Sequence, residues 1–219
     1  MSSKKGYVDT SIPLINSLLK LKIFIILSNW TFQGMLYADK TERLFRLLLD
    51  CLMTIILYAI INQLILGGYL ALIFAFLIAH TFNWIFNGQF FVLGRYIGIK
   101  PDKHNDFIKF IKEFKFRIEQ NKSIQLVVVY GSMARKELKE SSDLDVRIVR
   151  KKGIINAFKS CFFAFSERKK AFFNRFPLDL YVVDSTNHLS KMRLDEVPII
   201  IYDPDNLMKY ITTNEVAYA

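Results

Sequence analysis

Hydrophobic and polar residues are distributed unevenly along the chain. Residues 51–94 include no Asp, Glu, Lys or Arg. A bilayer core of about 30 Å is crossed by roughly 20 apolar residues in a helix. The uncharged stretch therefore predicts two transmembrane helices, at about residues 47–66 and 69–91, separated by Gly67-Gly68. Because this connection is so short, the two helices should form an antiparallel hairpin.

The segment before the hairpin has a weaker pattern. Residues 12–27 are apolar but interrupted by Asn16 and two lysines, which indicates an amphipathic helix lying in the membrane interface. A third crossing over Ile23–Tyr37 is the alternative, and it would place Asn29 and Gln33 in lipid. Residues 1–100 are thus expected to form a membrane anchor.

Basic residues flank only the outer ends of the predicted hairpin. The positive-inside rule places such ends in the cytoplasm. We therefore expect residues 101–219 to form a cytoplasmic domain, carried by a multi-pass integral membrane protein.

Helical and strand patterns alternate after Pro101. Apolar residues at helical spacing over residues 102–120 predict an amphipathic helix. The other expected elements are strands at Ile124–Tyr130, Asp143–Val149, Leu178–Val183 and Val197–Tyr202, a helix at Met133–Glu140 and a basic amphipathic helix at Ile154–Asn174. Such an alternation within about 120 residues predicts one small α/β or α+β domain.

Composition and charge narrow the class of protein. Hydrophobic residues make up 52% of the chain and the mean hydropathy is +0.23, which argues against a purely soluble protein. The net charge is +10, which suits an anionic membrane face, a nucleotide polyphosphate or a nucleic acid without choosing among them. The two cysteines, Cys51 and Cys161, give no basis for a disulfide framework.

The residues that could carry chemistry are concentrated in the stretch 127–149, VVVYGSMARKELKESSDLDVRIV. A predicted strand runs into Gly131-Ser132, where glycine lets a polyphosphate approach the backbone and N–H groups at a helix start can bind its oxygens. Asp143 and Asp145 alternate on the next strand, so both carboxylates should project from one face. Close carboxylates repel unless a cation neutralises them, and Mg²⁺ is the usual cation in phosphate chemistry. Asp179 would join them if its strand lies alongside.

In this order, the strand, Gly-Ser, Asp-hydrophobic-Asp and later strand Asp resemble the DNA polymerase β-type nucleotidyltransferase superfamily, in particular its minimal nucleotidyltransferase members. The resemblance covers residues 124–203 and leaves the anchor unexplained. It implies an α+β domain with a mixed sheet and flanking helices. It also implies transfer of a nucleoside monophosphate from a nucleoside triphosphate, with release of pyrophosphate, by two metal ions (Mg²⁺, with Mn²⁺ as a substitute).

The resemblance also assigns roles to residues. Gly131 and Ser132 would hold the triphosphate. Asp143 and Asp145 would hold both metals, and Asp179 would complete the metal site and help to activate the attacking hydroxyl.

Other polar residues are candidates with two interpretations. Arg135 could reach the triphosphate or lie on a solvated helix face, and Ser142 could contact phosphate or end the preceding turn. A run of four basic residues could bind a polyanionic substrate or anionic lipid, or could simply be solvated; it comprises Arg147, Arg150, Lys151 and Lys152.

Histidine and asparagine side chains give weaker signals. His80, Asn83 and Asn87 fall on one face of the second predicted crossing, where they could hydrogen-bond between helices or line a docking groove for a lipid headgroup. His104 and His188 have no metal-ligand spacing.

These observations predict a membrane-anchored nucleotidyltransferase whose acceptor is also at the membrane: a lipid-linked precursor, a lipid headgroup or a protein. A homo-oligomer could form through the transmembrane helices. A domain of about 120 residues lacks room for the extra helical modules of larger RNA-tailing relatives, which disfavours a nucleic acid acceptor. Two other functions stay open: a catalytically inactive nucleotide-sensing or scaffolding protein, and a toxin–antitoxin-like enzyme that modifies a protein.

Overall fold

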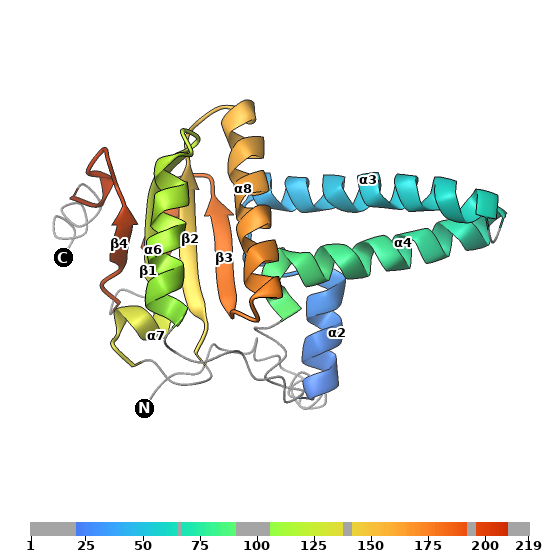
Figure 1. Cartoon of the computed structure of the whole chain (residues 1–219), viewed down its shortest axis with the longest axis horizontal. Coiled ribbons are helices and arrows are strands. Elements are labelled where there is room, and N and C mark those ends of the chain that lie inside the picture. The colour runs from blue at the N-terminus through green and yellow to red at the C-terminus, as the bar shows by residue number, and fades with distance from the viewer. Residues whose placement is uncertain (1–20, 65–66, 91–105, 138–141, 192–195, 210–219) are drawn as a thin grey trace, which may run out of the picture.

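A computed structural model shows a sheet-containing body from which two long helices project (Figure 1). The residues that it describes are 21–64, 67–90, 106–137, 142–191 and 196–209. The predicted fold class, α+β with a mixed sheet and flanking helices, agrees with the observed architecture.

Four strands form one sheet in the order β3-β2-β1-β4. They are β1 (Ile124–Tyr130), β2 (Leu144–Arg150), β3 (Leu178–Val183) and β4 (Ile199–Tyr202). β1 is antiparallel to β2 and β4, whereas β3 is parallel to β2. Parallel neighbours need a crossover connection, which the helix α8 (Ile154–Phe173) supplies. All four predicted strands are therefore confirmed, with ends that differ by two residues or fewer.

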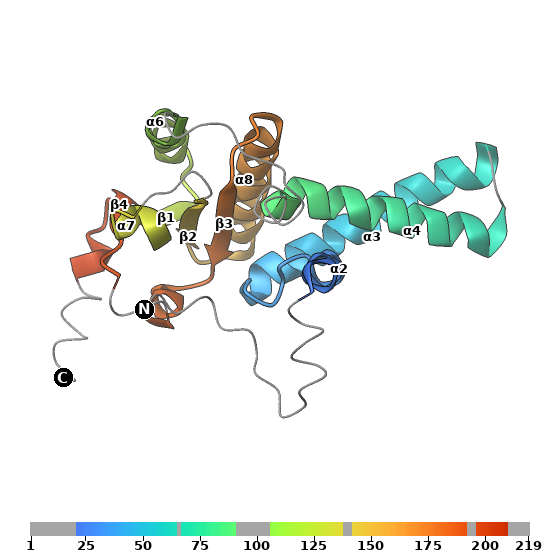
Figure 2. The same ribbon diagram turned by 90° about the horizontal axis from the view of Figure 1, so that it is seen from below.

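Both faces of the sheet are covered. α6 (Asp106–Glu119) and α8 lie on one face, as Figures 1 and 2 show. There, side chains such as Val127 and Ile148 pack with Phe114 of α6. The other face packs against Leu189 and Met208. Burial on both faces explains why the central strands read as nearly continuous apolar runs.

The two long helices are α3 (Lys40–Leu64) and α4 (Gly68–Trp84), and a π-helical turn, η1 (Ile85–Gln89), continues α4. They run side by side and away from the sheet (Figures 1 and 2). Ala71, Ala75 and Ala79 are buried on α4, and such small side chains let two helices approach closely. By length and composition alone, Lys40–Leu64 and Gly68–Asn87 could each cross a membrane. The first begins seven residues earlier than expected.

The helix α2 (Lys22–Phe32) lies across the base of these two helices (Figure 1). Its 11 residues span about 16 Å, which is too short for the alternative of a third crossing. Ile23 and Leu27 are exposed on it. Residues 12–20 of the predicted interfacial helix lie outside the described part of the chain.

The helix predicted at Met133–Glu140 is wrong in its extent over its described part, residues 133–137, and residues 138–140 lie outside the described residues. The observed helix, α7, comprises Gly131–Ala134. The N–H of Glu137 bonds to the carbonyl of Ser132, that of Lys136 bonds to Met133, and Lys136 has a φ of 58°. This pattern is a Schellman motif, in which a left-handed residue ends the helix.

A buried network of charged side chains connects the first turns of α3 to β3, on the edge of β3 that pairs with no other described strand. The Glu42 carboxylate accepts hydrogen bonds from the Val182 N–H (2.6 Å), Arg46 and Arg168. Arg168 in turn donates to the Leu180 carbonyl (3.0 and 2.7 Å). Glu42, Arg46 and Arg168 are all fully buried. The edge of β3 therefore has its backbone groups bonded by side chains rather than by another strand.

The polar face predicted on the second crossing joins the same network. His80 pairs with Asp50 (2.8 Å), and Asn83 donates to the Asp50 carboxylate (2.7 Å). The Asn87 side-chain carbonyl accepts from Arg168 (2.8 Å). The interpretation of these residues as inter-helix hydrogen-bonding groups is confirmed, since all three bond to other parts of the protein.

Candidate active site

Three carboxylates meet at one end of the sheet. Because β2 and β3 are parallel and in register, Asp145 lies directly beside Asp179. Asp143 immediately precedes β2, one residue outside the strand in which it was expected. Each of the three offers one oxygen within 4.8 Å of the others. Such a set of clustered carboxylate oxygens suits a hard divalent cation.

The end of β1 brings Gly131 against this cluster. Tyr130 pairs with Asp145 across the β1–β2 ladder, and Gly131 follows with a φ of +75°. A Cβ at Gly131 would lie 2.9 Å from Cγ of Asp145 and closer still to its Oδ2. Glycine is therefore required here both by the backbone conformation and by the close approach to a carboxylate.

Two polar atoms in this region have unused hydrogen-bonding capacity. Ser132 Oγ and Asp143 Oδ2 are buried, and neither has a hydrogen-bond partner among the described residues. Buried polar atoms are normally satisfied, so an orphaned one calls for an explanation. A metal ion on Asp143 and a phosphate oxygen on Ser132 would supply both partners, so the residues present fit these ligands.

A buried arginine, Arg147, contacts the acid cluster at Asp179. It donates hydrogen bonds to the carbonyls of Val146 (2.8 Å) and Asp179 (3.1 Å), and its guanidinium lies 3.6 Å from the Asp179 carboxylate. It also stacks on the Tyr181 ring at 4.8 Å. Burial alone would lower the pKa of Arg147, but Asp179 and Asp145 outweigh it and raise the pKa. Arg147 therefore stays charged and partly neutralises the carboxylates.

Arg135 lies beside Gly131 and is engaged by two carboxylates. It pairs with Glu137 (3.0 Å) and with Glu196. Its pKa is raised, chiefly by the hydrogen bond to Glu137 and also by Glu196. Glu196 is buried and accepts a hydrogen bond from the Gly131 N–H (3.0 Å). Glu196 thus occupies the Gly131 N–H, which the family resemblance assigns to the triphosphate, and Arg135, for which contact with the triphosphate is one of two interpretations.

The sequence gives no signal for the position of Glu196. It stands in no motif, and it precedes an ordinary apolar strand. Ser142 is half-buried next to Asp143, which is compatible with either of its interpretations.

The basic run does not form a single cluster. Arg147 points to the acid site, Arg150 pairs with Asp184 (2.8 Å), and Lys151 and Lys152 are exposed. Of the four basic residues, the two lysines are therefore the ones whose side chains are available to solvent or to lipid.

The two remaining histidines, His188 and His104, contribute nothing to the acid cluster as the structure describes it. His188 pairs with Asp39 (2.8 Å). His104 lies outside the described residues.

Comparison with known proteins agrees with this geometry. No curated protein matches the chain. Residues 112–206 match the model of a family described as "Polymerase beta, Nucleotidyltransferase". The match supports nucleotidyl transfer from a nucleoside triphosphate as the general activity of this domain, and domains of this kind typically use divalent metals. Within residues 112–206, the chain is thus similar to this nucleotidyltransferase family.

Proposed function

We propose that the protein is a membrane-anchored nucleotidyltransferase. It transfers a nucleoside monophosphate from a nucleoside triphosphate to an acceptor at the membrane, with release of pyrophosphate. The observation that carries this proposal is the convergence of Asp143, Asp145 and Asp179 beside the Gly131 turn.

The three aspartates would hold Mg²⁺, or Mn²⁺ in its place, as two ions. When bound, these ions stabilise charge on the attacking and leaving oxygens of an in-line displacement. The Ser132 hydroxyl orients the triphosphate together with the Gly131 N–H, which exchanges its bond to Glu196 for one to a phosphate oxygen. Arg135 and Ser142 stand at the border of the triphosphate. Asp179 accepts a hydrogen bond from the acceptor hydroxyl and aligns it.

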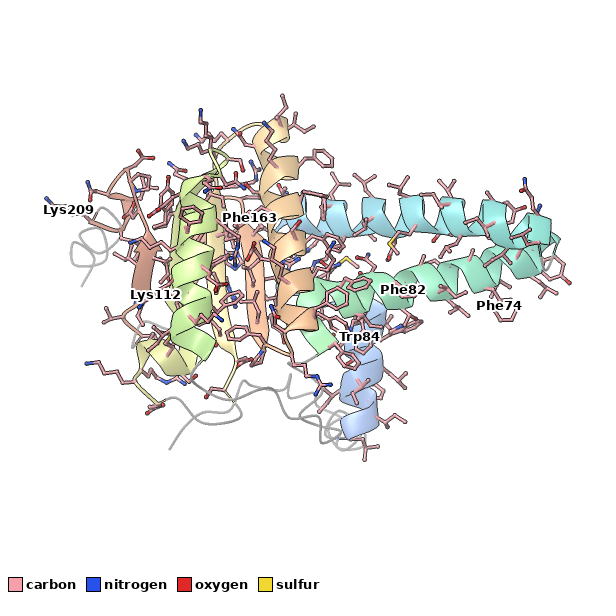
Figure 3. All side chains as sticks on the ribbon, viewed as in Figure 1. Phe74, Phe82, Trp84, Lys112, Phe163 and Lys209 are labelled. Carbon is pink, nitrogen blue, oxygen red and sulfur yellow. The ribbon has the colours of Figure 1, made fainter. Side chains whose placement is uncertain are left out.

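Exposed apolar surface on the two long helices supports the membrane anchor. The core helix of a soluble protein is mostly buried, whereas Leu52, Ile55 and Ile56 of α3 and Phe74 and Phe82 of α4 are all strongly exposed. Figure 3 shows Phe74 and Phe82 projecting outward from α4. A monomer rarely exposes so large an apolar patch to water.

The charges at the base support a cytoplasmic location for the domain that follows. Lys40 and Arg43 are exposed where α3 begins, and the 67–68 turn at the far end has no charged residue. Anchoring suits an acceptor that is itself a lipid-linked precursor, a lipid headgroup or a membrane protein.

The test is nucleotide transfer by the full-length protein in lipid nanodiscs. With Mg²⁺ and each of the four triphosphates labelled at the α-phosphate, the parent should release pyrophosphate and move label into a lipid or protein fraction. Asp145→Asn should abolish turnover, because a lost metal ligand removes stabilisation specific to the transition state. Asp205→Asn, an exposed acid away from the cluster, is the matched control.

Two results would count against the proposal. Triphosphate binding by the parent without pyrophosphate release would favour a nucleotide sensor. Equal turnover by Asp145→Asn and the parent would remove the acid cluster from the reaction.

A further inference from the structure

The outward face of α8 is apolar where a solvated helix would be polar. Ile154, Ile155, Phe158 and Phe162 are 74%, 67%, 44% and 64% exposed. Their spacing places them along one face of the helix, opposite the side that packs on the sheet. An amphipathic helix at the surface of a soluble domain turns charged and polar residues outward. This face is therefore built for contact with something other than water.

Positive charge surrounds the apolar face. The exposed lysines on and just before α8 are Lys151, Lys152, Lys159, Lys169 and Lys170. The one acidic residue of α8, Glu167, is buried and pairs with Arg117 (2.6 Å) and Lys170 (3.0 Å), which leaves the other four lysines without a partner from this acid. An apolar stripe bordered by lysines is the pattern of a helix that lies on an anionic bilayer.

Aromatic contacts join both ends of α8 to the two long helices. Near its start, Phe158 lies 6.4 Å from Phe45 of α3, measured between ring centroids. Near its end, Phe172 and Phe173 lie 5.7 and 6.2 Å from Phe86 of η1. α8 thus runs across the base of the α3–α4 pair rather than along it (Figures 1 and 2).

The level of α8 coincides with the level at which a bilayer would begin. Along α3, strongly exposed leucines start at Leu44 and continue to Leu64, a rise of about 30 Å. This equals the thickness of a hydrocarbon core, about 30 Å. Leu44 adjoins Phe45, which contacts α8.

An apolar cavity lies at the same level. It has a volume of about 330 Å³ and separates the beginnings of α3 and α8. Its lining includes Leu44, Phe45, Ile154 and Phe158. The cavity lining thus combines apolar side chains of α8 with side chains at the start of the α3 surface that would face lipid.

We propose that α8 lies in the interface of an anionic bilayer, with Ile154, Ile155, Phe158 and Phe162 inserted among the lipids and the flanking lysines against phosphate headgroups. This inference rests on the proposed membrane anchoring. A second copy of the chain is a poorer occupant, because two such faces would bring their lysines together. The catalytic sheet, which packs directly on α8, is consequently held against the membrane surface at a fixed height.

The test uses an environment-sensitive fluorophore on single cysteines of the full-length protein in phosphatidylcholine vesicles, with and without phosphatidylglycerol. The label is placed at Phe162→Cys in a Cys51→Ser background. The matched control is Phe116→Cys, which is 63% exposed on α6 and away from the two long helices (Figure 1). Cys161 is buried, so it is not labelled in the folded protein.

A label on native Cys51, exposed on α3, reports membrane insertion separately. Spin-labelled lipids that carry the quencher near the headgroup are then added. The expected result is a blue shift and quenching at position 162, stronger with the anionic lipid, and neither at position 116. Quenching at Cys51 without quenching at 162 would overturn the inference and leave the anchor intact.

Two other outcomes would also overturn it. Absence of quenching at both Cys51 and position 162 would refute membrane anchoring itself. Pyrophosphate release by the same protein measures the proposed nucleotidyltransferase activity separately, so the two failures can be told apart. A blue shift at 162 that grows with protein density and resists lipid quenching would identify a second copy as the occupant.

Discussion

Replacement of Gly131 by alanine probes the active-site geometry most sharply. The added Cβ would lie 2.9 Å from Cγ of Asp145, whereas ordinary contacts begin at 3.4 Å. Cγ must therefore retreat by at least 0.5 Å (3.4 − 2.9), and the nearer Oδ2 by more. We take the carboxylate displacement as roughly 1 Å, a misplacement that costs on the order of 100-fold in rate.

The backbone adds a separate cost to stability. Gly131 has a φ of +75°, and a left-handed conformation costs a non-glycine residue about 1–2 kcal/mol. Gly131→Ala should therefore lose that much free energy of unfolding while losing about 100-fold in turnover.

Gly68→Ala separates the two effects. Gly68 has a similar φ of +68°, but nothing lies within 4 Å of its Cβ position. It should show a comparable loss of stability and unchanged turnover. Both variants are compared by pyrophosphate release at saturating Mg²⁺, Mg²⁺ calorimetry and thermal unfolding in detergent. If Gly131→Ala keeps turnover and Mg²⁺ affinity within a few-fold of the parent, Asp145 does not act from the position that the turn enforces.

Three further predictions follow from charge and burial. Glu196→Gln should tighten triphosphate binding by up to about 10-fold in calorimetry, because a charged competitor for the groups proposed to bind phosphate is removed. Weaker binding would instead make Glu196 a positioning residue. Glu42→Gln leaves two buried arginines without a counter-charge and should cost about 3–5 kcal/mol in unfolding experiments, whereas Glu113→Gln, at a half-exposed pair, should cost less than about 1 kcal/mol. Burial raises the pKa of the Cys161 thiol to about 12, so the unreactive thiol form persists at pH 8. Mass spectrometry after iodoacetamide at that pH should find Cys161 unmodified in the folded protein and modified after denaturation, and modification of Cys161 in the folded protein would contradict the burial.

Local patterns explain which parts of this fold the sequence predicts. The runs that form β1 and β3 are short and mostly apolar, with β-branched and aromatic residues in each, so their type and ends follow from the local sequence. Asp143 and Asp145 could likewise be placed together, because a two-residue spacing on an extended chain fixes their common side. Their meeting with Asp179 depends on strand order, which the family resemblance suggests and residue spacing does not.

The parts that sequence reasoning misses are contacts between distant residues. Glu42 and Arg168 are 126 positions apart. From its sequence neighbours alone, each would be interpreted as a charged residue at the surface. Glu196 reaches Gly131 across 65 positions without any motif. The end of α7 at Lys136 is missed for a different reason, since a lysine in the left-handed conformation has no compositional signature.

The side-chain bonding of the β3 edge bears on how the chain can be divided. A shortened protein that starts after the two long helices would lack Glu42, which accepts from the Val182 N–H. Arg168 would then be a buried cation facing an open strand, and an unpaired edge is a template for aggregation. During synthesis α3 and α4 emerge before β3, so Glu42 is already present when the edge of β3 forms. The sheet-containing part of this protein is thus expected to fold together with the two long helices and to precipitate when it is separated from them.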